Sequence, residues 1–272
     1  MPYLIVGAAL LLSLLILRAA LGNVSGIARL ESGFSKTLGN RQINADEYDW
    51  AHYQNETLLT LADGKGPGTK GQTAARVAVH IMSRVFELTG TGQNPAFFFR
   101  NSYNGVNSTI LRYVPDSTAG ASLLCAVVKD GLLYYALAGN CKISVYRKGE
   151  LYELSEGHTI DVLARRAFLR HKITRLDALE AVKESRLYNF VGKDGFRDLE
   201  MFEEPVKLKQ GDIIVLMTDG VYDFCTSRQI EEILMTRGSC EKMARQITNL
   251  LDCANHPEQD NASVILARVN GI

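Results

Sequence analysis

Two apolar runs in this 272-residue sequence each end directly in an Asp-Gly pair. Thr57–Ala62 runs into Asp63-Gly64, and Ile213–Thr218 runs into Asp219-Gly220. Runs of this length and composition predict buried strands. A single Asp-Gly pair is an ordinary turn signal. Two strands that each deliver a carboxylate at their end instead favour a shared site for a hard cation, because Mg²⁺ and Mn²⁺ prefer oxygen ligands.

Further strands are predicted at 122–128, 132–138, 143–146 and 262–269, which are rich in Val, Ile, Leu and Tyr. Lys129-Asp130-Gly131 and Arg147-Lys148-Gly149-Glu150 have the residue types of hairpin turns. We therefore expect the strands at 122–128, 132–138 and 143–146 to form an antiparallel meander.

Apolar residues at intervals of three and four predict five helices, at 73–88, 96–113, 175–186, 227–235 and 241–251. Ser227 and Ser239 are the expected N-caps of the last two. Antiparallel strands with amphipathic helices between them predict an α+β fold, with helices packed outside a sheet core.

The composition narrows the classes of function. Lys plus Arg and Asp plus Glu both number 30, so the chain lacks the basic excess of a nucleic-acid-binding protein. The five cysteines include no CxxC pair, which argues against a disulfide framework or a zinc site and for reduced thiols. We predict no nucleic-acid partner.

The N-terminal segment is distinct from the rest of the chain. Tyr3–Leu17 carries no charge, and Arg18, Arg29, Lys36 and Arg41 follow it while no basic residue precedes it. We interpret residues 1–22 as a single-pass membrane anchor, with the C-terminal side in the cytoplasm by the positive-inside rule. A cleaved signal peptide and a buried helix stay open as alternatives. Residues 23–39 would form a connector and a first strand, and residues 40–272 one domain.

Six short motifs occur in an order that resembles the PP2C-type metal-dependent serine/threonine phosphatases, bacterial members included. They span about Gly33 to Val269 and are Arg41-Gln42-Ile43-Asn44-Ala45-Asp46, Ala62-Asp63-Gly64-Lys65-Gly66 with Gly71, Gly139-Asn140-Cys141-Lys142, Gly157-His158-Thr159, Thr218-Asp219-Gly220-Val221-Tyr222-Asp223 and Asp260-Asn261-Ala262-Ser263.

The resemblance implies an α-β-β-α sandwich with two Mn²⁺ or Mg²⁺ ions at one end, and hydrolysis of phosphoserine and phosphothreonine in proteins by a metal-activated water. By the same resemblance, Asp63 bridges the metals and the Gly64 carbonyl ligates. Asp219 and Asp260 hold the first metal, Asp46 orients water and Arg41 binds the phosphate. The expected partners are phosphorylated proteins and a cognate kinase.

The sequence departs from the family pattern at four places, one of which is the glycine loop, where Pro67 and Lys70 differ from the common loop. Ala45 stands where many members have Glu or Gln, and Lys65 where some have a histidine proposed as general acid. Asn140 replaces a likely family carboxylate, so a third metal there would bind weakly. These departures keep open a pseudophosphatase that acts as a binding or regulatory module. A small-molecule phosphatase is a third hypothesis.

Three further features allow both a structural and a functional interpretation. His158 is structural or catalytic, and Cys141 is a buried thiol or a nucleophile. The basic cluster is a solvated face or a recognition surface for acidic ligands, and its residues are Arg165, Arg166, Arg170, His171, Lys172 and Arg175.

Overall fold

The computed structural model describes residues 29–181, 186–254 and 256–271. Its elements in chain order are β1 (Arg29–Thr37), β2 (Glu47–Tyr53), β3 (Glu56–Lys65), α2 (Lys70–Thr89), α3 (Pro95–Tyr113), β4 (Gly120–Lys129), β5 (Leu132–Ala138), β6 (Lys142–Arg147), β7 (Glu150–Glu153), α4 (Ile160–Leu169), α5 (Arg175–Ala181), β8 (Glu200–Met201), β9 (Val206–Lys207), β10 (Ile213–Met217), α6 (Asp219–Tyr222), α7 (Ser227–Met235), α8 (Cys240–Ala254) and β11 (Ala262–Gly271).

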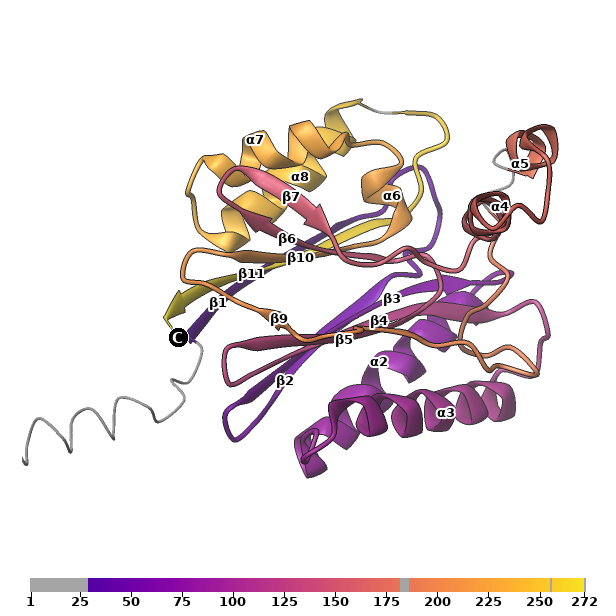
Figure 1. Ribbon diagram of the computed structural model, residues 1–272, viewed down its shortest axis with the longest axis horizontal. Helices are drawn as coiled ribbons and strands as arrows, with labels where there is room; N and C mark the ends of the chain where they lie inside the picture. The colour runs from indigo at the N-terminus through magenta and orange to yellow at the C-terminus, as the bar shows by residue number, and fades with distance from the viewer. Residues whose placement is uncertain (1–28, 182–185, 255, 272) are drawn as a thin grey trace, which may run out of the picture.

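Two antiparallel sheets lie face to face, and helices cover the outer face of each (Figure 1). One sheet has the strand order β1-β11-β10-β6-β7, and the other has the order β2-β3-β4-β5-β8, with β9 paired to β5. Helices α2 and α3 cover the second sheet, and α7 and α8 cover the first (Figure 1). The predicted α+β fold with two antiparallel sheets flanked by helices is confirmed.

Successive residues of β3 belong to different cores, because side chains alternate between the two faces of a strand. Leu58 and Ala62 pack with α2 and α3, whereas Leu59 and Leu61 pack between the two sheets. A third core joins β10 and β11 to α7 and α8. A strand that is covered on both faces has a continuous apolar sequence. For this reason the runs at 57–62 and 213–218 could be predicted as buried strands.

The predicted meander over 122–146 is wrong. β4 and β5 form a hairpin in one sheet, but β6 pairs with β10 and β7 in the other. The chain crosses between the sheets at Gly139, whose φ is +127° and where a Cβ would lie 2.2 Å from the Ser122 Oγ. Both β5 and β6 are apolar on both faces, so hydrophobicity alone does not reveal that they belong to different sheets.

The five predicted helices correspond to α2, α3, α5, α7 and α8, whereas α4 was missed. Helix α5 is described over Arg175–Ala181, and residues 182–185 of the predicted range lie outside the described residues. Thr226, not Ser227, caps α7, and its side chain accepts a hydrogen bond from the Gln229 backbone N–H within a capping box. Ser239 precedes α8, and its hydroxyl accepts from the Lys242 N–H at 3.3 Å.

The predicted membrane anchor, residues 1–22, lies outside the described residues. Among the helices of the described part, none combines the length and the apolar character that crossing a bilayer requires. All five cysteines are free thiols.

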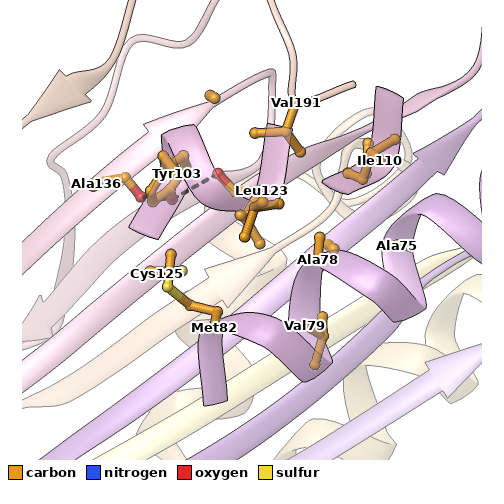
Figure 2. Close-up of a cluster of buried hydrophobic side chains, with 14 of the residues drawn as sticks. Ala75, Ala78, Val79, Met82, Tyr103, Ile110, Leu123, Cys125, Ala136 and Val191 are labelled. Atoms are coloured by element: carbon orange, nitrogen blue, oxygen red, sulfur yellow. Dashed lines mark hydrogen bonds between the residues drawn. The ribbon is translucent and has the colours of Figure 1, made fainter. Parts of the chain in front are cut away.

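Tyr103 of α3 ties the helical layer to the sheet beneath it. Its side chain is fully buried, and its hydroxyl donates hydrogen bonds to the carbonyls of Leu123 at 3.1 Å and Ala136 at 2.7 Å (Figure 2). These carbonyls belong to neighbouring strands β4 and β5. One phenol therefore holds α3 in register with two strands.

We expect Tyr103→Phe to lower the free energy of unfolding by about 1–2 kcal/mol, because two buried carbonyls lose a donor. Denaturant unfolding followed by circular dichroism measures the change. The matched control is Tyr113→Phe at the end of the same helix, where the side chain is 65% exposed. Equal destabilisation by the two substitutions would refute the structural role of the Tyr103 hydroxyl.

Candidate active site

The predicted carboxylates meet at one end of the sandwich, on the side of α6 (Figure 1). Asp63 lies near the end of β3, Asp219 begins α6 directly after β10, and Asp260 precedes β11. Antiparallel pairing of Thr37 with Ala262 brings the loop that carries Arg41 to the same end. These four side chains line one open pocket of about 600 Å³ together with Gly64 and Asn140.

Two glycines allow the backbone to approach closely enough to form this pocket. A Cβ on Gly64 would lie 2.3 Å from the carbonyl oxygen of Gly71, at the start of α2. A Cβ on Gly220 would lie 2.0 Å from the carbonyl oxygen of Asn261. The glycine that follows each strand-end aspartate therefore has a packing reason beyond the turn, because any side chain there would push neighbouring backbone apart.

Asp46 lies behind the pocket and is buried. Its Oδ2 accepts a hydrogen bond from the Thr218 hydroxyl at 3.0 Å, while its Oδ1 has no partner among the described residues. The preceding Ala45 N–H donates to the Asn261 side chain at 2.8 Å, and the Ala45 carbonyl accepts from the Gly64 N–H at 3.2 Å. No role for Thr218 or Asn261 was predicted from the sequence, since neither residue type alone indicates a hydrogen bond to Asp46 or to the Ala45 N–H.

Asn140 contacts the catalytic pocket through Asp219. Its Nδ2 donates to the Asp219 Oδ2 at 2.8 Å, and its backbone carbonyl accepts from the Tyr222 hydroxyl at 2.8 Å. Its Oδ1 is buried without a partner in the described part of the chain. An amide therefore neutralises part of the Asp219 charge by hydrogen bonding at a position where a carboxylate would repel it.

Arg41 forms a bidentate pair with Asp260, with N–O distances of 2.8 and 2.6 Å. The Arg41 and Asp260 side chains are 55% and 43% exposed. Exposed ion pairs contribute little net stability, so this pair can be exchanged for another anion at small cost. Arg41 thus lies at the predicted phosphate pocket but holds a predicted metal ligand.

The carboxylates raise one another's pKa. Burial raises the pKa of Asp46 to about 7 and that of Asp219 to about 6. Burial raises the pKa of Asp63 well above its ordinary value, and the charges of Asp219, Asp46 and Asp260 raise it further. A divalent cation would relieve this repulsion, because it favours the ionised form of each carboxylate.

The donor set fits a hard cation such as Mn²⁺ or Mg²⁺, since it consists of carboxylate, amide and backbone oxygens with no thiolate or imidazole. Among the described residues, however, no three His, Cys, Asp or Glu side chains are arranged to hold a metal ion together. Asp260 pairs with Arg41 and Asp219 accepts from Asn140. The assigned ligand roles stay predictions.

Other predicted features lie apart from these carboxylates or at their edge. Lys65 lines the pocket and lies 4.9 Å from the Phe190 ring. Cys141 is buried, and burial raises its thiol pKa well above the ordinary value, which disfavours a nucleophilic thiolate. His158 does not line this pocket.

The basic cluster runs from α4 through the connecting loop to the start of α5. Two of its residues, Arg165 and Arg166, pair with Glu156.

The model of the protein phosphatase 2C family matches residues 35–260. The chain is 22% identical over 223 residues to "Serine/threonine phosphatase stp" of Listeria welshimeri, which covers 79% of this chain and 86% of that protein. It is 23% identical over 250 residues to "Protein phosphatase PhpP" of Streptococcus pneumoniae, covering 89% and 98%. The serine/threonine phosphatase of S. agalactiae is similar in fold, with a TM-score of 0.76, 18% identity and coverage of 89% and 100%.

The raised pKa values predict how stability depends on pH. Asp46 and Asp219 have folded-state pKa values of about 7 and about 6, above their ordinary 3.8. Their contribution is complete below pH 3.8 and is lost as pH rises through 6 and 7. In excess chelator we expect the Tm to fall between about pH 4 and pH 7, and less so in Asp46→Asn.

Mn²⁺ should raise the Tm more at pH 8 than at pH 5, because only ionised carboxylates bind it. Thermal unfolding with chelator and with Mn²⁺ measures both effects. A wild-type profile identical to that of Asp46→Asn would contradict the electrostatic coupling.

Proposed function

The chain belongs to the protein phosphatase 2C family, and on that premise we propose that it hydrolyses phosphoserine and phosphothreonine in proteins with the aid of Mn²⁺ or Mg²⁺. The observation that carries this proposal is the meeting of Asp63, Asp219 and Asp260 with Arg41 in one open pocket. The similarity of the chain to proteins named serine/threonine phosphatases supports the same substrate class.

Asp63, Asp219 and Asp260 would hold two cations, with the Gly64 carbonyl as a further ligand. Bound there, the cations would supply positive charge and a water molecule of lowered pKa. Asn140 could add only a neutral oxygen, which binds a hard cation less strongly than a carboxylate. We therefore propose two cations and assign no strong third site.

The protein's own groups position the phosphate and the water. Arg41 presents a planar fork of donors that matches two phosphate oxygens, and its pairing with Asp260 shows that it reaches the carboxylates. Lys65 lines the same pocket and adds positive charge. Asp46, held by the Thr218 hydroxyl, has one oxygen without a partner in the described part of the chain, and this oxygen could accept a hydrogen bond from water.

A catalytically inactive binding module is the alternative, motivated by Ala45 and Asn140. The feature that would favour it is loss of one of the three pocket aspartates, and all three are present. A small-molecule phosphatase would use the same groups. The pocket is open to solvent, which is compatible with a segment of protein chain as substrate.

The decisive experiment compares hydrolysis of a phosphothreonine peptide by the wild type and by Asp63→Asn. We expect turnover that requires Mn²⁺ or Mg²⁺ and falls at least about a thousandfold in the variant, because a shared ligand is removed. Phosphate release measures the rate. The matched control, Asp130→Asn, changes an exposed hairpin aspartate of β4–β5 and should leave the rate unchanged.

Turnover in excess chelator, or an Asp63→Asn protein as active as the wild type, would refute metal-dependent catalysis. Absence of turnover in the wild type under every metal condition would favour the binding module.

We also propose that residues 1–22 anchor the protein in the membrane with the catalytic domain in the cytoplasm, where a cognate kinase would use ATP. The register of the sheet supports this arrangement. β1 begins at Arg29 opposite Gly271 and ends at Thr37 opposite Ala262, beside the pocket. The pocket therefore lies near the end of β1 that is opposite to Arg29, the first described residue.

A reporter fused after Ile272 should signal only from the cytoplasm. Arg18→Glu, combined with two lysines inserted before Tyr3, should weaken or invert that orientation, because flanking charge sets it. A mature protein that begins near Asn23 and is found outside the cell would show a cleaved signal peptide instead.

A further inference from the structure

A second cavity of about 710 Å³ shares no lining residue with the catalytic pocket. Arg100 and Asn104 of α3, Arg166 of α4 and Arg197 of the segment before β8 contribute to its wall. His158 also lines it. Three guanidinium groups and one imidazole therefore converge on a space that the proposed hydrolysis does not use.

The orientation of the His158 ring is set by the backbone of Gly139. The Gly139 N–H donates to the His158 Nδ1 at 3.1 Å, and the His158 N–H donates to the Gly139 carbonyl at 2.7 Å. The ring also packs edge-on against Tyr188, with centroids 5.4 Å apart. Because Nδ1 accepts a hydrogen bond, the neutral imidazole carries its proton on Nε2.

Nε2 is therefore a donor, and it has no hydrogen-bond partner among the described residues. The His158 side chain is buried, with 3% of the residue exposed. The cavity that His158 lines is the space open to this N–H. Burial lowers the pKa of His158 to about 4, so the ring stays neutral and keeps this tautomer at neutral pH.

Both basic and acidic side chains line the cavity, and few of them form ion pairs with one another. No carboxylate in the described part of the chain pairs with Arg100 or Arg197, whereas Arg166 pairs with Glu156 at 2.8 Å. Two acidic residues line the same cavity, Asp198 and Glu200.

The Glu200 carboxylate already accepts from the backbone N–H groups of Glu156 and Gly157, at 2.8 Å each. The Asp198 carboxylate has no such partner among the described residues, and its charge acts on the His158 ring, where it partly offsets the effect of burial on the pKa.

We propose that this cavity is a second anion site, which binds a phosphoryl group through the His158 Nε2–H and the guanidinium groups of Arg100 and Arg197. A phosphoryl group offers several acceptor oxygens and matches the arginine fork. Its two sources are free phosphate and phosphate carried by a peptide. The site requires no metal and no catalysis, so it stands independently of the proposed hydrolysis.

A path of hydrogen bonds connects the proposed anion site to the candidate active site. An anion bound at Nε2–H makes Nδ1 a stronger acceptor, because hydrogen bonds in a chain polarise one another. The Gly139 N–H bond to Nδ1 then strengthens. Gly139 precedes Asn140, whose side chain donates to Asp219. Binding of the anion should therefore change the Gly139 backbone amide, which lies between His158 and the pocket carboxylates along this path.

The test titrates inorganic phosphate into the metal-free, full-length ¹⁵N-labelled protein and follows the His158 imidazole and the Gly139 amide by NMR. Without cations the catalytic carboxylates repel phosphate, so the response reports on the second cavity. We expect saturable shifts at both positions, with the Gly139 amide proton moving downfield.

The variant Arg100→Gln with Arg197→Gln should weaken phosphate binding at least about tenfold, because two charge-assisted hydrogen bonds are lost. Its matched control is Arg84→Gln, at an exposed arginine on α2 that pairs with Glu87 and does not line the cavity. No shift at His158, or a shift that the double variant leaves unchanged, would overturn the proposal. So would a shift abolished by Arg41→Gln, since phosphate would then occupy the catalytic pocket.

A second arm replaces phosphate with a phosphothreonine peptide, which the metal-free protein does not hydrolyse. Shifts at His158 at a much lower concentration of peptide than of phosphate would identify a peptide-borne phosphate as the ligand. Equal or weaker binding of the peptide would identify free phosphate. Either result supports the anion site, and a peptide response that is insensitive to the Arg100 and Arg197 substitutions counts against it.

Discussion

Mutual repulsion among buried carboxylates is the constraint on which this end of the molecule depends. Asp63, Asp46 and Asp219 are each desolvated, and the charge of Asp219 contributes to the raised pKa of both other carboxyls. Packed strands hold these groups together because the three cores of the sandwich fix the strand ends on which they lie. The stability of the packing thus offsets an unfavourable charge arrangement, which is a common property of functional sites.

Backbone contacts between distant segments convert that packing into a defined site. The Gly64 backbone lies against Gly71, and Gly220 lies against Asn261. Asn261 in turn accepts from the Ala45 N–H, which positions the neighbouring Asp46. The segment before β2, the end of β3, the start of α6 and the segment before β11 are therefore in contact at the pocket. A shift of any one of them would displace a carboxylate, so the geometry of the site and the fold are specified together.

Much of this arrangement could be predicted from sequence, because strands buried on both faces and helices with one apolar face leave clear patterns. The strands at 57–62 and 213–218 and helix α7 illustrate this. The partner sheet of β6 could not be predicted, since a pattern of burial does not say which surface covers a strand. Helix α4 was missed because Arg165 and Arg166 interrupt its short apolar run and were assigned to the basic cluster. The motifs identified the pocket residues, but the pairing of Arg41 with Asp260 depends on a tertiary contact that no spacing encodes.

That pairing and the contact of Asn140 with Asp219 have one electrostatic explanation. Each places a hydrogen-bond donor on a carboxylate that would otherwise face like charges. The Arg41 pair is exposed and exchangeable, whereas the Asn140 contact is part buried and held in place by Tyr222 and Ser122. A cation or a phosphate would therefore meet an exposed pair at Asp260 and Arg41 and a more enclosed contact at Asn140. One Asp219 oxygen is bound to the Asn140 amide, and the backbone of Gly139 joins this contact to the His158 ring.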